Sequence, residues 1–190
     1  CVKIIDLTPE NFDRYGLGCL KNPKHEGFKS KSEWLKERFS EGLKIKILLE
    51  KEIPVGFIEY TPGEISWRSV DAQNCMFIHC IWVYPKIYQK KGYGGLLVKE
   101  CIEDSKKQKK SGVAVVTSEG PWIAGKSLFV KNGFKAVDKK DRFELLVNTF
   151  EKGETPKFKN IIAENYKGLN LFYSDQCPMC VKFVNEIKEA

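Results

Sequence analysis

A basic, glycine-rich turn is the first candidate site for chemistry in this chain. Residues 89–95 read Gln-Lys-Lys-Gly-Tyr-Gly-Gly and lie between an apolar run over 76–83 and apolar residues at helical spacing from Leu96 onward. Such a run is typical of a buried strand, and the spacing after the turn is typical of a helix. Glycines let the backbone approach a ligand closely, and a helix N-terminus favours an anion. The turn therefore predicts a phosphate-binding site.

Ionisable side chains near this turn are candidates for proton transfer. His79 lies on the same predicted strand, and alternation places it on the face of Ile81 and Val83. An imidazole with a pKa of about 6.5 can take a proton from an ammonium at neutral pH; a structural histidine in the core is the alternative. Glu59, on an earlier strand, and Glu119, after a later one, are candidate bases acting through a water. For both, the alternative is an ordinary surface carboxylate.

A Cys-x-x-Cys motif is the second candidate for chemistry. Cys177 and Cys180 follow apolar residues 169–173 and precede a helical pattern. A helix N-terminus lowers the pKa of a leading cysteine, which favours a redox-active thiolate. A redox or thiol-binding pair, a structural appendage and half of a metal site are all open interpretations. Because two thiols alone lack the further ligands of a zinc site, we predict no metal site.

Composition predicts a soluble, folded, cytoplasmic protein. Of the 190 residues, 42% are hydrophobic and 30% charged, and no apolar run reaches the roughly 18 residues of a membrane span. Residues 1–6 show no signal peptide and no initiating Met, so the start of the chain is expected to be trimmed. Seven cysteines, an odd number, predict reduced thiols. The net charge is +7, but the basic residues are spread along the chain. We therefore expect neither a nucleic-acid nor a membrane partner.

The remaining pattern predicts a mixed α/β fold. Apolar runs predict strands, and segments with apolar residues at helical spacing predict helices, one of which ends with Gly133 at its C′ position. Residues 149–166 are polar and turn-rich, which predicts a linker between a domain over 1–148 and a C-terminal segment over 167–190. The expected strands lie at 2–7, 44–49, 55–60, 76–83, 112–117, 134–137, 143–147 and 169–173, with 65–70 as a short extension.

Two segments resemble the motifs of one enzyme superfamily. Residues 83–95, Val-Tyr-Pro followed by the glycine turn, resemble the acetyl-CoA motif of the GNAT superfamily of N-acetyltransferases, V-x-P and then Q/R-x-x-G-x-G/A. Residues 128–134, Leu-Phe-Val-Lys-Asn-Gly-Phe, are similar to the superfamily's L-Y-x-K-x-G-F. The order of expected elements over 1–148 is also similar. The resemblance implies the GNAT fold, a mixed and mostly antiparallel central sheet flanked by helices, and acetyl-CoA as cosubstrate.

The resemblance also implies roles for particular residues. An amine would attack the thioester directly, and His79 occupies a place where some members carry a working histidine. The superfamily's frequent general acid, a tyrosine, is Phe129 here, and a phenyl ring donates no proton, so the acid is unassigned. Trp122 stands where an asparagine often contacts pantetheine; with Trp67 and Trp82 it is a candidate for an acceptor pocket, and core packing is the alternative. The implied acetyl-CoA contacts are Ile81, Trp82 and Val83 for pantetheine, and Gln89, Lys90, Lys91, Gly92, Tyr93, Gly94 and Gly95 for pyrophosphate.

The C-terminal segment resembles the first strand, redox motif and helix of glutaredoxins and thioredoxins. Joined to an acetyltransferase, it resembles bacterial acetyltransferases with a YoaP-like C-terminal domain, and residues 167–190 are too few to complete such a domain. We therefore predict an N-acetyltransferase acting on a primary amine of an unidentified small molecule or protein. The alternative is a catalytically weak CoA- or thiol-sensing module, and monomer and homodimer are both open.

Overall fold

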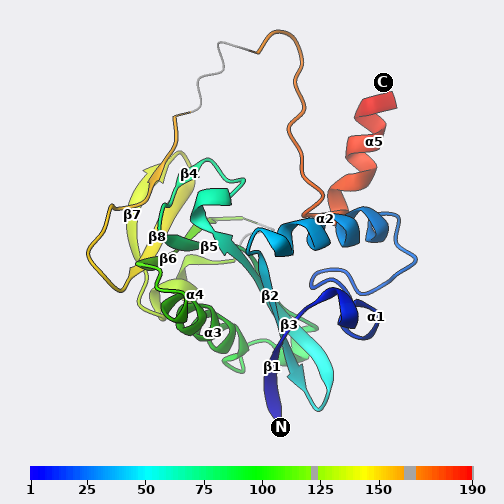
Figure 1. Ribbon diagram of the computed structural model, residues 1–190, viewed down its shortest axis with the longest axis horizontal. Coiled ribbons are helices and arrows are strands. Elements are labelled where there is room, and N and C mark those ends of the chain that lie inside the picture. Colours follow the sequence, from blue (N-terminus) through cyan, green and yellow to red (C-terminus); the bar gives the residue numbers. More distant parts are fainter. Residues whose placement is uncertain (121–123, 161–165, 190) are drawn as a thin grey trace.

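The computed structural model describes residues 1–120, 124–160 and 166–189, in which helices cover both faces of a central sheet (Figure 1). The order of elements along residues 1–148 agrees with the predicted one. The strands are β1 (Val2–Asp6), β2 (Lys44–Glu50), β3 (Ile53–Pro62), β4 (Val70–Asp71), β5 (Cys75–Val83), β6 (Gly112–Ser118), β7 (Lys135–Lys140), β8 (Phe143–Thr149) and β9 (Lys157–Phe158). The helices are α1 (Phe12–Tyr15), α2 (Phe28–Ser40), α3 (Tyr93–Lys107), α4 (Lys126–Val130) and α5 (Val181–Glu189).

The central sheet has seven strands in the order β1-β2-β3-β5-β6-β8-β7. Every neighbouring pair is antiparallel except β5 and β6, which are parallel. A parallel pair needs a crossover connection, and α3 supplies it. The mixed, mostly antiparallel sheet predicted from the sequence is therefore confirmed.

Alternating side chains divide the core between the two faces of the sheet. Leu48 of β2 packs with the α3 residues Leu97 and Cys101 on one face. Its neighbours Ile47 and Leu49 pack on the other face, with residues of α1 and α2. This alternation follows from the period of two along a strand. The sheet therefore holds α3 and α4 on one side and α1 and α2 on the other.

Three features differ from the predicted elements. The expected strand extension over 65–70 was wrong, because Gly63–Ile65 form a 3-10 turn and strand structure begins only at Val70 in β4. Residues 157–158, inside the predicted linker, form β9 and pair with β4 in a separate two-stranded sheet. Residues 169–173 form no strand, so that prediction was wrong; Leu169 there is 94% exposed. These apolar residues have no strand partner in the described part of the chain, and an isolated strand has no stabilising ladder.

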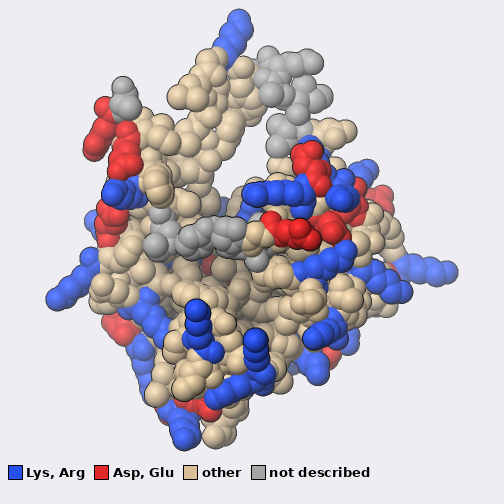
Figure 2. All heavy atoms as spheres, turned by 180° about the vertical axis from the view of Figure 1, so that it is seen from behind, with Lys and Arg blue, Asp and Glu red and all other residues tan. Residues whose placement is uncertain are grey.

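The end of the chain returns to α2. A 3-10 turn over Pro178–Cys180 precedes α5, and Figure 1 shows α5 next to α2. The close contact is with the loop before α2, because a Cβ on Gly27 would lie 2.9 Å from the Pro178 side chain. Figure 2 shows lysine and arginine side chains distributed over one face of the molecule and interspersed with acidic ones. Among the described residues, no helix is long and apolar enough to span a membrane.

Candidate functional site

The parallel strands β5 and β6 separate halfway along their length. Their pairing runs from Cys75 with Gly112 to Ile78 with Val115 and then stops, although β5 continues to Val83. β3 remains paired with β5 as far as the Gly56–Val83 pair. One edge of β5 beyond Ile78 is therefore open to an extended ligand, since β6 no longer pairs with it.

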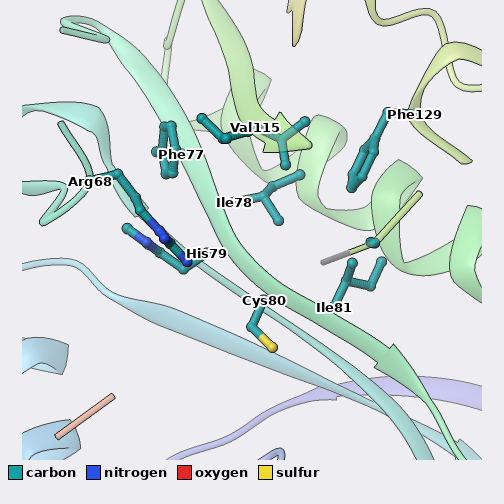
Figure 3. A pocket seen from close by; sticks show the side chains of 10 residues that line it. Arg68, Phe77, Ile78, His79, Cys80, Ile81, Val115 and Phe129 are labelled. Atoms are coloured by element: carbon teal, nitrogen blue, oxygen red, sulfur yellow. The ribbon is translucent and has the colours of Figure 1, made fainter. Parts of the chain in front are cut away.

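A cavity lies where the two strands separate (Figure 3). Its lining comes from β5, β6, α4 and the loop before β4. In Figure 3, Phe77, His79 and Arg68 lie on one side of β5, while Ile78, Ile81 and Phe129 lie on the other. The full lining is Arg68, Phe77, Ile78, His79, Cys80, Ile81, Val115, Val116, Ala124 and Phe129.

The glycine turn leads directly into α3, as predicted. Gly92 precedes the helix with φ of +82°, a conformation that a residue with a Cβ adopts at a cost. The first helical bond joins the Leu96 N–H to the Gly92 carbonyl at 3.1 Å, so the N–H groups of Tyr93, Gly94 and Gly95 precede the helical ladder. Among the described residues, no side chain caps this end. The turn is thus a backbone cradle of the kind that binds phosphate.

The side chains around the turn are arranged to leave this cradle accessible. Lys90 and Lys91 are exposed, and the Lys91 Nζ lies 5.1 Å from the centre of the Tyr88 ring. Gln89 donates from Nε2 to the Val83 carbonyl at 2.9 Å and so fixes the turn to the end of β5. A Cβ on Gly92 would meet nothing within 4 Å, which shows open space at the turn. These residues fit the pyrophosphate group that the sequence resemblance implies.

His79 is half-buried and packs in an aromatic stack. Its ring lies parallel to Trp67 with centroids 3.5 Å apart, and Nε2 shares a hydrogen bond of 3.1 Å with the Thr61 hydroxyl. Nδ1 is buried without a partner among the described residues. Burial, and secondarily the charge of Arg68, holds the pKa of His79 well below 6.5. The imidazole is therefore neutral at pH 7.

The predicted face of His79 was wrong. Ile81 and Val83 pack toward α3, but His79 contacts Trp67 and Phe77 on the other face. The register of β3 and β5 shifts between Glu59 and Tyr60, so that His79 falls opposite no single residue. A bulge adds one residue to a strand and reverses the alternation beyond it.

Glu59 flanks the same bulge and is not a surface carboxylate. It is 1% exposed and pairs with Lys31 of α2, which is 0% exposed, at 3.4 Å. Gln176 of the C-terminal segment completes the group: its Nε2 donates to Glu59 at 2.8 Å, and its carbonyl accepts from Lys31 at 2.5 Å. Burial opposes the charge on Lys31, but Glu59 together with the thiols of Cys19 and Cys80 outweighs it, and the pKa of Lys31 is raised. The alternative of a surface position is thus wrong for Glu59.

The remaining predicted residues lie in several places. Glu119 follows β6, is exposed and does not lie at the bulge between β3 and β5. Phe129 is fully buried at an edge-on contact with Phe134, 5.5 Å between centroids. Trp82 is 50% exposed, so the core alternative does not hold for it, and it contacts Tyr84. Trp122 lies outside the described residues.

The two cysteines of the C-terminal motif stand at the two ends of the 3-10 turn that leads into α5. Cys177 is half-buried and precedes the turn, and Cys180 is exposed. Burial and the neighbouring Cys177 raise the pKa of Cys180. Within the described residues no group of three or more His, Cys, Asp or Glu side chains is arranged to hold a metal ion. A redox role for the pair stays a prediction.

Several residues of the site were missed by the sequence reasoning. Arg68 and Thr61 come close to His79 through the fold and have no spacing signal, whereas Trp67, which stacks on the ring, was already a candidate for an acceptor pocket. Lys31 did carry one, because it stands on the apolar stripe of α2 between Phe28 and Leu35. A lysine at a buried helical position needs a buried partner, and Glu59 is that partner.

Comparison with known proteins supports the resemblance. The sequence model of the "Acetyltransferase (GNAT) family" matches residues 10–134. An N-acetyltransferase of Bacillus subtilis (strain 168), YoaP, described as uncharacterized, is 30% identical over 194 residues, which cover 97% of this chain and 76% of that protein.

Solved structures share the fold at lower identity. The PaiA N-acetyltransferase of Thermoplasma acidophilum, in complex with coenzyme A, is 16% identical with a TM-score of 0.56 and covers 79% of this chain and 99% of its own. A ribosomal-protein-alanine N-acetyltransferase of Brucella melitensis is also 16% identical with a TM-score of 0.56, and covers 78% of this chain and 99% of its own.

Proposed function

Because this chain belongs to the GNAT family of acetyltransferases, whose members use acetyl-CoA, we propose that it moves the acetyl group to a primary amine by direct attack. The observation that supports this most is the joint position of the uncapped N-terminus of α3 and the open edge of β5. A long ligand with a phosphate part and an amide-bearing arm fits that pair of features. The amine acceptor is an unidentified small molecule or protein.

We assign the binding of acetyl-CoA mainly to backbone groups. The N–H groups at residues 91–95 would bind the pyrophosphate, and Lys90 and Lys91 would add positive charge. The open edge of β5 at Ile81, Trp82 and Val83 would pair with the amides of the pantetheine arm. The thioester would then lie near the cavity where β5 and β6 separate.

His79 is the candidate base. The amine nitrogen forms a bond to the acetyl carbon, the carbon–sulfur bond breaks with its electrons going to sulfur, and the ammonium proton must leave. If the His79 Nε2–H donates to Thr61, Nδ1 is a free acceptor for that proton. Its lowered pKa keeps it unprotonated at neutral pH and so able to accept a proton, although it also makes the ring a weaker base than an ordinary histidine.

Phe129 supplies no proton to the departing thiolate. It is fully buried and has no ionisable group. The thiolate would leave unprotonated or take a proton from solvent. Glu59, already bound by Lys31 and Gln176, is less suited than His79 to accept a proton in this arrangement.

An acceptor screen tests this function. Purified protein with acetyl-CoA and a panel of primary amines is assayed for CoA release and for an acetylated product by mass spectrometry. His79→Gln should lower kcat/KM at least 100-fold, in the range of a lost general base, with unchanged acetyl-CoA affinity. His25→Gln, at the chain's other histidine, is the matched control. Binding of acetyl-CoA with no transfer to any amine would support the CoA-sensing alternative instead.

A further inference from the structure

The buried Lys31–Glu59 pair is covered by a segment far away in the sequence. Gln176 contacts both charges, and Pro178 fits against Gly27 at the start of α2. Glu59 pairs across the sheet with Cys80, and Cys80 lines the cavity where β5 and β6 separate. The covered ion pair therefore lies beside the proposed reaction site, although the proton transfer described above makes no use of it.

The two contacts of Gln176 have opposite polarity. Its side-chain nitrogen donates to the Glu59 carboxylate, and its main-chain carbonyl accepts from the Lys31 ammonium. An acceptor that carries an amine at one end and a carboxylate at the other would make the same two contacts with stronger charges. In glutamine four carbons separate the side-chain nitrogen from the main-chain carbonyl group. The matching free molecule is an ω-amino acid with that spacing.

We propose that the Lys31–Glu59 pair is the acceptor-recognition site, that it binds zwitterionic amino acids, and that Gln176 occupies it as an internal mimic. This inference rests on the proposed acetyltransferase function. Glu59 holds the amine beside Cys80, and Lys31 holds the carboxylate. An acceptor must displace the Gln176 segment before it can bind, so the C-terminal segment competes with the acceptor.

A lysine buried with its carboxylate is expensive to maintain for packing alone. Apolar side chains of similar volume often stabilise a core as well or better. Trp34, with its ring 5.8 Å from the Lys31 Nζ, adds an aromatic wall on the α2 side. Burial also raises the pKa of the neighbouring thiols of Cys19 and Cys80. The charged atoms at this place are thus Lys31 and Glu59, set among neutral groups.

Alkylation of Cys177 measures displacement of the Gln176 segment and needs no enzymatic turnover. Cys177 is half-buried next to Gln176, and Cys180 is exposed and serves as the internal reference. With iodoacetamide and peptide mass spectrometry, 5-aminopentanoate should raise the rate at Cys177 relative to Cys180 at least threefold. Pentylamine, which lacks the carboxylate, should not. Equal effects of the two compounds, or no effect of either, would overturn the proposal.

Kinetics supply the second measurement. Gln176→Ala removes the donor to Glu59 and should lower KM for 5-aminopentanoate about tenfold, the scale of a hydrogen bond to a charged group, without changing KM for acetyl-CoA. Gln108→Ala, which removes a comparable donor to Asp104 at the far end of α3, is the matched control. A raised KM for 5-aminopentanoate or a lower kcat in Gln176→Ala would show that Gln176 supports the site structurally, and would refute the proposal that it competes with the acceptor.

The two proposals fail separately. If no amine is acetylated but 5-aminopentanoate still accelerates Cys177 alkylation, the recognition site stands and the transfer function falls. If other amines are acetylated while Cys177 is unaffected by 5-aminopentanoate, the function stands and the recognition site is refuted.

Discussion

Glu59→Gln should destabilise this protein more than any exposed charge substitution. The change leaves the Lys31 ammonium fully buried and replaces the carboxylate oxygen 3.4 Å away by a neutral amide. Removing one member of a buried pair costs about 3–5 kcal/mol, because the remaining charge is unpaired. A domain of this kind is stable by about 5–15 kcal/mol in total, so the loss is a large part of it.

Urea unfolding followed by tryptophan fluorescence measures this change. With a slope of about 2 kcal/mol per molar urea, the midpoint should fall by about 2 M. Lys31→Met combined with Glu59→Gln should recover part of the loss, since no unpaired charge is then buried. Glu119→Gln, the same substitution at an exposed residue, should cost less than about 0.5 kcal/mol. A loss below about 1 kcal/mol for Glu59→Gln would refute the argument that the pair is buried and coupled.

Three further outcomes follow from the described contacts. Lys90→Ala with Lys91→Ala should weaken acetyl-CoA binding about fivefold to tenfold by calorimetry and reduce its salt dependence, whereas the exposed pair Lys139→Ala with Lys140→Ala on β7 should leave both unchanged. Burial and Arg68 lower the pKa of His79, so the acid limb of the kcat/KM profile should lie well below about pH 6.5. Arg68→Gln should move this limb to higher pH. A wild-type limb at the ordinary histidine value would contradict the neutral ring. Burial opposes ionisation of Asp104, but hydrogen bonds and charge from its partners, Lys44 and Tyr60 among them, outweigh burial and lower its pKa. The stabilisation from this network is therefore present above the pKa of Asp104 in the unfolded chain and is lost as the pH falls through its pKa in the folded protein. Asp104→Asn should make stability depend less on pH in the acid range, and an unchanged dependence would show that the network contributes nothing.

Local features of the sequence predicted the strand, the turn and the helix of the proposed donor site. The glycine turn, the strand before it and the helix after it are consecutive in the chain, so one short segment determines the cradle. Gly133 likewise adopts φ of +86° after α4, as its position after the helical pattern predicted. Glycine positions of this kind are predicted reliably from the sequence, because they require backbone conformations that few other residues adopt.

The proposed acceptor site depends on contacts that no local pattern contains. Residues 28 positions apart form the Lys31–Glu59 pair, and Gln176 joins it from the opposite end of the chain. The bulge at His79 was equally invisible, because an alternating apolar pattern does not reveal an extra residue. Apolar residues at 169–173 satisfied strand propensity, but a strand also needs an edge to pair with.

The position of bound acetyl-CoA tests the central claim most directly. A crystal structure of this protein with CoA should show the pyrophosphate at the N–H groups of residues 91–95 and the pantetheine arm along the open edge of β5 at Ile81–Val83. The thiol should then lie at the cavity beside His79 and Cys80. Pyrophosphate bound away from the start of α3, or an arm that does not follow β5, would contradict the assignment of the donor site.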